Sequence, residues 1–584
     1  MAENHQAAQF PPPVRYIVGF TDARTHYLSV EALLPIEGQA EVEVFLPVWT
    51  PGSYLIREYS RHLEGLAASL SGGEPLRVWK THKNRWRIET GGAGQVRLTY
   101  RLYCREMSVR TNWVEQSFAL INGAPAFVTL PEYLGRSYEI QLELPPRWKT
   151  TVTGLGAGVG EHCYCAESYD ALVDSPILCG NPSLFKFEVD GIPHVLANEG
   201  ECGVWDGPRA TADAEKLVRQ HRAFWGPLPY SKYVFLNLLT EVRGGLEHRN
   251  SMCVMTSRWA TRTRRAYLGW LHLVSHEFFH VWNGKRLRPV ELGPFDYENE
   301  NYTRTLWIAE GITDYYGPLA VRRAGLSSME EYLESLSGMI RVLQSTPGRS
   351  VQSAEQASWD AWIKLYRPDE NSGNTTISYY IKGAVVAWLL DARIRRATAG
   401  VRCLDDLMRQ AHARYAATSG FTGAQFKSLA AEVAGVPLDD FFRRAVESTD
   451  ELDYREALDW FGLRFRQEAR QEAKKVATLG CETRIDNGRL VVTRVPRETP
   501  AFDAGINVDD EIVAIDDFRV RPDQLAQHLE NYRSVDSVSL LIARRDLLQR
   551  IHLKLGDEPA RSELEIHPDA TEEQKRNLAN WLGL

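Results

Sequence analysis

The chain has 584 residues, of which 44% are hydrophobic, 25% charged and 10% aromatic. These proportions are typical of folded globular proteins and exclude disordered and fibrous classes, and the length predicts roughly two to four domains. The 68 Lys and Arg against 76 Asp and Glu residues give a net charge of −8 that is spread along the sequence. We therefore expect no nucleic-acid partner.

The sequence predicts neither a membrane span nor a secretion signal. The longest uncharged run, residues 116–131, is shorter than the roughly 20 apolar residues that a span needs. The first residues, MAENHQAAQFPPPVRY, lack a basic start followed by an apolar segment. Eight cysteines without a CxxC pair indicate reduced thiols, so we expect a cytoplasmic protein.

Residues 1–190 are predicted to form a β domain. β-branched and aromatic residues alternate with polar ones in several short stretches, and clusters of Pro, Gly, Asn and Asp separate them. The expected strands are 14–20, 27–34, 40–48, 95–103 and 138–145. Many short strands with turn signals between them are typical of a β-sandwich.

Residues 191–470 are predicted to form an α+β domain, because two β-rich stretches, 233–239 and 253–257, precede long helical patterns. The expected helices are 266–282, 305–324, 329–344, 379–398 and 404–418. A charged stretch at 466–475 predicts a linker. A compact β-rich segment follows within 471–560, and a polar tail is expected at 561–584.

The strongest chemical signal is the HEFFH motif formed by His276, Glu277 and His280. On a helix, positions i and i+4 stack about 6 Å apart along the axis, so two imidazoles can hold one Zn²⁺. Glu277 would lie beside the ion without binding it, as a general base on zinc-bound water. The helix is apolar on most faces, and a buried, uncompensated His/Glu cluster would be costly, which favours a metal.

His272 lies one turn earlier on the same face, about 12 Å along the axis from His280. It is too far for both to bind one ion, so we expect it to pack in the core or to support the ligands.

A catalytic zinc ion needs a third protein ligand and one open position. We expect Glu310 as this ligand, because it is a carboxylate among apolar neighbours in the helix 305–324. Asp314 follows one turn later and can accept the free N–H of a zinc-bound imidazole, which would fix its tautomer. The alternatives are acids in the preceding loop, where solvation is easy and positioning poor: Glu291, Asp296, Glu298 and Glu300.

Gly244 and Gly245 follow a strand pattern and precede Glu247. Glycines let another backbone approach closely, so an extended peptide laid against this edge would gain main-chain hydrogen bonds. Glu247 would supply a negative charge for the substrate's α-ammonium group.

Tyr379 and Tyr380 begin the helix 379–398, and a tyrosine hydroxyl there can donate to the oxyanion of a tetrahedral intermediate.

Together these motifs resemble the glycyl aminopeptidase family of zinc peptidases. This family belongs to the thermolysin-like clan, and its sequences include a PDZ domain. LPVWTPGSYLIREYSRH is similar to the family's N-terminal β-domain signature. Four further segments resemble its catalytic segments: GGLEH, HEFFHVWNGKRLRP, ENYTRTLWIAEGITDYY and SYYIKGAVVAWLLD. The resemblance covers nearly the whole sequence.

The resemblance implies one catalytic Zn²⁺ with His276, His280 and Glu310 as ligands and Glu277 as general base. It also implies that Gly244, Gly245 and Glu247 recognise the substrate amine and that Tyr380, rather than Tyr379, binds the oxyanion. Two features depart from related enzymes: the spacing from His280 to Glu310 is longer than in thermolysin, and GGLEH ends in His248 where the related motif has Asn.

The segment 471–560 resembles a PDZ domain. Residues 478–481 stand in the place of the carboxylate-binding loop, with Thr478 where a glycine is usual, and Asp509 stands where such domains often have glycine. The resemblance implies a peptide or the carboxyl terminus of a protein as a partner bound by strand addition, with a purely structural role as the alternative.

The sequence therefore predicts a multidomain α+β zinc aminopeptidase. Its parts are an N-terminal β-sandwich-like domain, a thermolysin-like α+β catalytic domain with a helical bundle, and a C-terminal PDZ domain. Its substrates are peptides with a free N-terminus, and the family implies glycine or alanine at the first position. The alternatives are a zinc endopeptidase and a PDZ-based adaptor with a structural zinc, although a structural site has no use for a base at Glu277.

Overall fold

The computed structural model describes residues 11–417, 419–466, 477–557 and 563–584. The chain forms two compact units, one of residues 1–301 with 415–420 and one of residues 302–414 with 421–584. Residues 1–10, and all but the first residue of the charged stretch at 466–475, lie outside the described residues. The sequence predicts no secretion signal in the first of these stretches and a linker in the second. Both predictions therefore concern residues that the structure does not describe.

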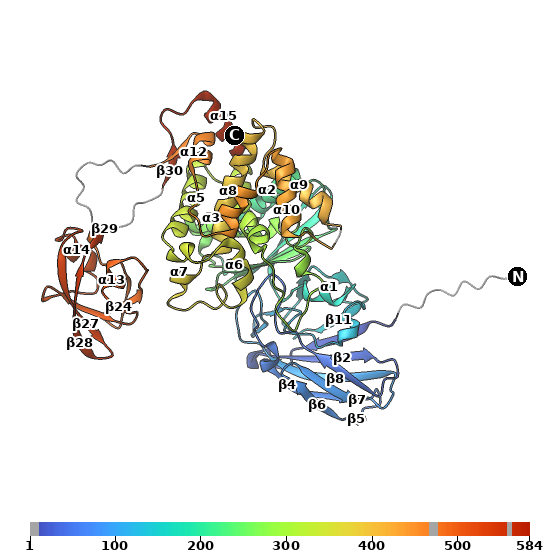
Figure 1. Cartoon of the computed structure of the whole chain (residues 1–584). Helices are drawn as coiled ribbons and strands as arrows, with labels where there is room; N and C mark the ends of the chain where they lie inside the picture. Colours follow the sequence, from blue (N-terminus) through green and yellow to red (C-terminus); the bar gives the residue numbers. More distant parts are fainter. Residues whose placement is uncertain (1–10, 418, 467–476, 558–562) are drawn as a thin grey trace. The chain divides into compact units, whose positions relative to one another are not determined.

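Residues 11–180 are rich in β-strands, as the sequence predicts (Figure 1). The largest sheet has the order β13-β14-β11-β1-β2-β8-β4-β5. Its strands are Gly156–Ala157, Cys163–Ala166, Tyr138–Glu143, Val14–Gly19, Tyr27–Pro35, Gln95–Tyr103, Leu63–Ser69 and Pro75–Leu76. Burial alternates along β2 and β8, which places one face of this sheet on a core shared with the neighbouring strands.

Two smaller sheets complete this region. A three-stranded sheet has the order β3-β7-β6, Glu41–Phe45, Arg85–Glu89 and Val78–His82. A four-stranded sheet has the order β12-β15-β10-β9, Thr150–Thr153, Ile177–Gly180, Ala119–Ile121 and Trp113–Val114. The short helix α1 spans Tyr169–Val173.

A five-stranded sheet follows, with the order β16-β17-β18-β20-β19. Its strands are Ser183–Val189, Ile192–Glu199, Tyr233–Leu239, Ser251–Thr256 and Gly244–Glu247. The parallel strands β18 and β20 are buried along their whole length, as continuous apolar runs in parallel sheets are. The helices α2, Gly207–Trp225, and α3, Arg264–Phe279, pack against each other, and α3 lies on β19 and β20. The sheet therefore places its edge strand β19 beside α3.

The second unit is mainly helical, which confirms the predicted α+β class with a helical C-terminal region. A π-helical turn, Trp307–Gly311, leads into α4. The helices α4–α12 are Ile312–Arg323, Met329–Gln344, Ala354–Trp359, Ser372–Thr375, Tyr379–Ala397, Leu404–Tyr415, Gly423–Ala434, Asp439–Phe442 and Arg455–Phe461. The expected helices 329–344, 379–398 and 404–418 agree with α5, α8 and α9 within a few residues, although residue 418 lies outside the described part.

The residues 477–557 contain a separate β-rich segment with a core of its own. Its main sheet has the order β23-β24-β25-β27-β28, and β26 pairs with β25. Its elements are β22 Ala477–Thr478, β23 Glu482–Asp486, β24 Arg489–Arg494, α13 Pro500–Asp503, β25 Glu511–Ile515, β26 Phe518–Arg519, α14 Leu525–Leu529, β27 Ser537–Arg544, β28 Leu547–Lys554 and β29 Gly556–Asp557.

Residues 563–584, which belong to the polar tail predicted from the sequence, contain one strand and one helix. Strand β30, Leu564–Ile566, pairs antiparallel with β21, Leu463–Phe465. Helix α15, Glu572–Leu582, buries three apolar side chains at i, i+3 and i+4 on one face, and its other positions are mostly polar: Leu578, Trp581 and Leu582. Three apolar residues change the composition of a polar stretch very little. At this spacing, however, they are enough to give a helix one apolar face that can pack against the rest of the unit.

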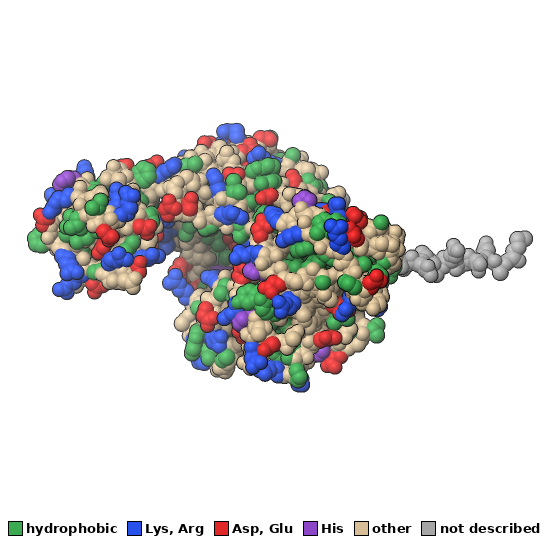
Figure 2. All heavy atoms as spheres, turned by 90° about the horizontal axis from the view of Figure 1, so that it is seen from below, with side chains coloured by type: hydrophobic (Ala, Val, Ile, Leu, Met, Phe, Trp, Pro, Cys, Tyr) green, Lys and Arg blue, Asp and Glu red, His purple; other side chains and the backbone are tan. Residues whose placement is uncertain are grey.

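No helix among the described residues combines the length and the apolar character needed to span a bilayer. On the face shown in Figure 2, acidic and basic side chains are interspersed rather than segregated by sign.

Trp581 anchors this last helix, so we expect its removal to destabilise the second unit. The indole is fully buried, stacks on Phe461 at 4.2 Å between ring centroids, and donates to the Tyr315 hydroxyl at 2.7 Å. Trp581→Ala should lower the free energy of unfolding by about 3–5 kcal/mol. Lys575→Ala, on the exposed face of the same helix, should change it by less than about 0.5 kcal/mol. Denaturant unfolding of both variants measures the difference; equal stabilities would contradict the anchoring role.

Candidate metal and substrate site

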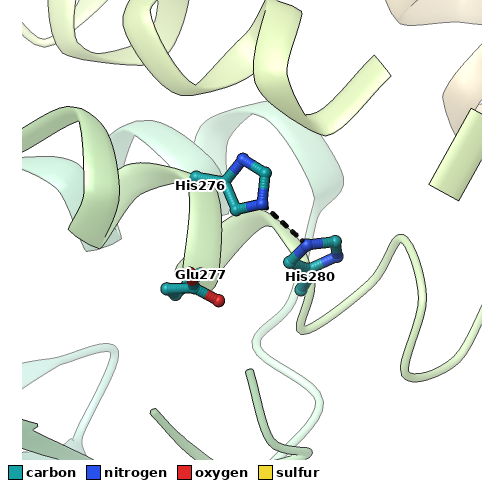
Figure 3. Close-up of side chains that lie close together, drawn as sticks. All are labelled: His276, Glu277 and His280. Atoms are coloured by element: carbon teal, nitrogen blue, oxygen red, sulfur yellow. Dashed lines mark hydrogen bonds between the residues drawn. The ribbon is translucent and has the colours of Figure 1, made fainter. Parts of the chain in front are cut away.

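Helix α3 brings His276, Glu277 and His280 together (Figure 3). One ligand atom from each lies within 4.8 Å of the other two, and these residues form the one such group of three or more His, Cys, Asp or Glu within the described part of the protein. The helix begins at Thr263, whose side chain accepts from the Ala266 N–H, and it ends where His280 caps it. The predicted motif therefore forms on the last turn of a buried helix.

The two imidazoles are arranged to share one ion. Their Nε2 atoms lie 3.0 Å apart, and the Nδ1 of His280 is 2.7 Å from the carbonyl oxygen of Asn283. Because a carbonyl can only accept, Nδ1 of His280 carries the proton and its Nε2 keeps a lone pair. Two nitrogens at this separation can both lie about 2.0–2.1 Å from one ion, the Zn–N distance in proteins. These residues fit zinc.

Glu277 is held against the edge strand β19. Its side chain is buried, and a Cβ added to Gly245 would lie 1.9 Å from the Glu277 Oε1. Only glycine leaves room for the carboxylate at this place. Leu246 points into the core between the four- and five-stranded sheets, so the alternation of a strand turns Gly245 and Glu247 to the opposite face, toward α3. The structure thus brings Gly245 and the predicted base into contact.

Glu247 lies in a small buried cluster of charges. Lys285 Nζ is 3.7 Å from Glu247 Oε1 and 2.8 Å from Asp174 Oδ1. His248 Nδ1 lies 3.2 Å from the same Asp174 oxygen. On another side, a Cβ at Gly52 would lie 2.6 Å from Glu247 Oε1, so a turn of the N-terminal β region closes on this carboxylate. Glu247 is therefore buried and fixed among partners.

Asp174 stays ionised in this cluster. Burial opposes its charge, but the Lys285 ammonium and the hydrogen bond from His248 outweigh burial and hold the pKa of Asp174 well below its ordinary value. The N–H of Arg249 also donates to its second oxygen at 2.8 Å. The low pKa of Asp174 thus favours its ionised form near Glu247.

Glu310, Asp314 and Tyr380 lie in the second unit. Glu310 is buried in the π-helical turn, where the N–H of Ile312 bonds to the Trp307 carbonyl five residues back, and such turns are frequent at functional sites. Asp314 is half-buried in the first turn of α4.

Two glycines bring this turn against α8. A Cβ at Gly311 would lie 2.5 Å from the Cα of Gly383, and one at Gly383 would lie 2.7 Å from the Trp307 carbonyl oxygen. The close approach brings Glu310 near Tyr380. Burial raises the pKa of Tyr380 well above its ordinary value, and the negative charge of Glu310 raises it further. Tyr380 therefore remains a neutral phenol that can donate a hydrogen bond.

Tyr380 has a second tyrosine beside it, because the Tyr366 hydroxyl lies 3.2 Å from the Tyr380 hydroxyl. Tyr379 stacks on Tyr380 but is itself fully buried, whereas Tyr380 is half-buried.

Two of the alternative loop acids have other partners. Glu298 binds the Arg85 guanidinium and the Asn84 amide, each at 2.8 Å. Asp296 accepts from the N–H groups of Glu298 and Asn299 and so closes its own turn. Both carboxylates stabilise the loop.

Sequence reasoning missed Asp174, Lys285 and Tyr366. Lys285 lies in the HEFFHVWNGKRLRP segment, but nothing in that segment shows which acids it meets. Asp174 lies about a hundred residues upstream at the end of α1, and only the fold brings it to the site.

Paired histidines with an adjacent carboxylate on one helix are the metal-binding arrangement of metallopeptidases, and comparison with known proteins confirms this class. Residues 269–386 match the family described as M61 glycyl aminopeptidase, and residues 15–181 match the Peptidase M61 N-terminal domain. Both matched regions are those of M61 peptidases, which confirms the resemblance predicted from the sequence. The matches also support an aminopeptidase.

Solved structures resemble this chain to different degrees. An aminopeptidase N family protein from Idiomarina loihiensis is 29% identical with a TM-score of 0.91, and the match covers 97% of this chain and 100% of that one. An M1 zinc metallopeptidase from Deinococcus radiodurans is 12% identical (TM-score 0.48; 76% and 94% covered). Legionella pneumophila aminopeptidase A is 13% identical (TM-score 0.46; 75% and 49% covered). A comparison with curated proteins gives no match.

The contact between Gly245 and Glu277 yields a direct test. Gly245→Ala would push the Glu277 carboxylate out of place, so we expect kcat to fall about 100-fold while the fold is kept. Gly269→Ala, on the helix α3 that carries Glu277, is the control, because its added methyl meets only the Arg243 guanidinium at an ordinary 3.5 Å. Steady-state kinetics with matched melting temperatures measures the effect. A fully active Gly245→Ala enzyme would show that Glu277 needs no fixed position.

Proposed function

We propose that the protein is a zinc-dependent aminopeptidase that removes the N-terminal residue from peptides, with a preference for glycine or alanine at that position. The observation that carries this proposal is the pair of facing imidazole nitrogens with Glu277 beside them on a glycine-lined strand. The family match supports it.

His276 and His280 would hold the ion, and we propose Glu310 as the third ligand, with Asp314 supporting one of the imidazoles. A bound zinc ion would supply a Lewis acid for the peptide carbonyl and would make a water molecule more acidic. The buried carboxylate of Glu310 in a rigid helical turn supports its assignment over the loop acids.

Glu277 would act as general base and then as general acid. Its carboxylate would take a proton from the attacking water and pass it to the leaving amine. The contact with Gly245 holds the carboxylate in one orientation, which general-base catalysis requires. Tyr380 would donate its hydroxyl proton in a hydrogen bond to the oxyanion, and its raised pKa keeps that proton in place.

Strand β19 would bind the substrate backbone through Gly244 and Gly245, and Glu247 would bind the substrate's α-ammonium group. In the described sheet β19 is an edge strand, and an extended peptide can add to such an edge. The fixed position of Glu247 among buried partners supports a binding role.

We also propose that 477–557 is a PDZ domain within a protein organised as 1–190, 191–470, 471–560 and 561–584. The antiparallel sheet, the two short helices and the independent core support this assignment, and Gly480 keeps the loop at 478–481 in a left-handed turn with φ +76°. The unpaired thiols of the eight cysteines support the cytoplasm as the proposed compartment.

Glu277→Gln tests the catalytic proposal. The amide keeps the size of the side chain but cannot accept the proton of water, so we expect kcat to fall by about 10²–10⁴ with the zinc content unchanged. Glu291→Gln, at an exposed loop acid that is also an alternative ligand, should keep both activity and metal. Metal analysis and kinetics on aminoacyl amides give the two readouts. Full activity in Glu277→Gln would refute the mechanism.

Acetylation of the substrate separates an aminopeptidase from an endopeptidase. Removing the α-ammonium charge should abolish its interaction with Glu247, so we expect kcat/KM for an N-acetylated peptide to fall at least about 100-fold relative to the free peptide. Product analysis by mass spectrometry should show release of one residue at a time. Equal cleavage of both peptides would favour the endopeptidase.

A further inference from the structure

Asn374 of helix α7 attaches the β-rich segment 477–557 to the helical part of the second unit. The side chain of Asn374 is only 5% exposed. Its Nδ2 donates to the Val495 carbonyl oxygen at 3.0 Å, and its Oδ1 accepts from the Arg497 N–H at 2.8 Å. Val495 packs in the core of the β-rich segment, so these bonds reach the body of the segment. One buried side-chain amide therefore joins it to α7.

The turn that leads into α7 is held together by its own side chains. The Oδ1 of Asp369 accepts from the Asn371 N–H at 3.0 Å and from the Ser372 hydroxyl at 2.9 Å. The Oδ1 of Asn371 accepts from the Nδ2 of Asn374 at 3.0 Å. We therefore expect the position of this turn to follow that of Asn374. Tyr366 lies just before the turn in the sequence.

The beginning of α8 has contacts of its own. The Ile377 N–H donates to the side-chain oxygen of the buried Gln352 at 3.2 Å. The backbone of Thr376 lies against Gly348, where an added Cβ would collide with the Thr376 carbonyl oxygen. Both contacts are made within the helical part of the unit. We therefore expect the backbone of Tyr380 to keep its place when the attachment to the β-rich segment is lost.

We propose that Asn374 is a positioning residue, which holds Tyr366 beside Tyr380 by binding α7 to the β-rich segment. The Tyr366 hydroxyl lies 3.2 Å from the Tyr380 hydroxyl. A hydrogen bond between the two groups limits the rotation of the Tyr380 O–H, so this donor is oriented before the reaction and needs less reorganisation during it. The inference rests on the proposed function, in which Tyr380 binds the oxyanion. The β-rich segment thereby acts on turnover through α7.

Kinetics on alanine 4-nitroanilide at pH 7 test the proposal. Asn374→Ala removes both hydrogen bonds to the β-rich segment, so kcat should fall about tenfold while KM changes less than about threefold, because an oriented donor acts on the transition state. Asn531→Ala is the matched control. Asn531 is an exposed asparagine of the β-rich segment whose amide donates to the Gln527 and His528 carbonyl oxygens in its own turn. Its removal should leave kcat and KM unchanged.

A double-mutant cycle with Tyr366→Phe distinguishes positioning from general stability. Tyr366→Phe removes the hydroxyl, so kcat should fall at least as far as in Asn374→Ala. If Asn374 acts through Tyr366, the double variant should have the kcat of Tyr366→Phe within about twofold. Losses that multiply in the double variant would overturn the proposal, as would a wild-type kcat in Asn374→Ala.

Asn374→Asp provides a second measurement if the alanine variant does not fold. The carboxylate keeps the shape of the side chain and the bond from Arg497 but cannot donate to Val495, so kcat should lie between those of the wild type and Tyr366→Phe; an unchanged kcat would refute the inference. Tyr380→Phe is measured in parallel and should lose about 100-fold in kcat. An unchanged kcat in Tyr380→Phe would refute the proposed oxyanion role and this inference with it. A low kcat there beside a wild-type kcat in both Asn374 variants would refute the inference alone.

Discussion

The contact between helix α3 and the edge strand β19 is the interaction on which the site depends. Because Leu246 is buried in the core behind the strand, Gly245 and Glu247 face the helix, and the absent side chain of Gly245 leaves the space that Glu277 occupies. One glycine thus lets a buried acid on helix α3 pack directly against the backbone of the edge strand β19. Close packing, rather than a network of strong bonds, positions the chemistry.

The sequence predicts those features of the site and the fold that depend on the spacing of residues within one helix. The HEFFH motif fixes which side chains share a helical turn, and the boundaries of α5, Met329–Gln344, follow from an apolar period with a Ser328 capping box. The π-helical turn at Trp307–Gly311 and the burial of Trp581 were not predicted, because both depend on packing partners distant in the sequence. For the same reason no pattern shows that Asp174 meets Lys285.

Both units use glycine pairs or single glycines at the places where functional side chains are predicted. Gly245 admits Glu277, Gly52 borders Glu247, and Gly311 with Gly383 lets the turn that carries Glu310 approach the helix that carries Tyr380. A methyl group at any of these positions would displace either a carboxylate or a helix. Sensitivity to substitution therefore extends to residues that have no side-chain chemistry of their own.

The pairing of β21 with β30 has a consequence for how the protein can be shortened. Phe465 and Leu564 are direct partners across this two-stranded ladder, so the segment between them leaves and re-enters the helical unit at neighbouring points. The β-rich segment is thus an insertion at the tip of a hairpin. A premature stop upstream of it would also delete the closing helix. An internal excision that joins the two strands by a tight turn would keep β21, β30 and α15, and would remove the hydrogen bonds that Asn374 of α7 makes with Val495 and Arg497.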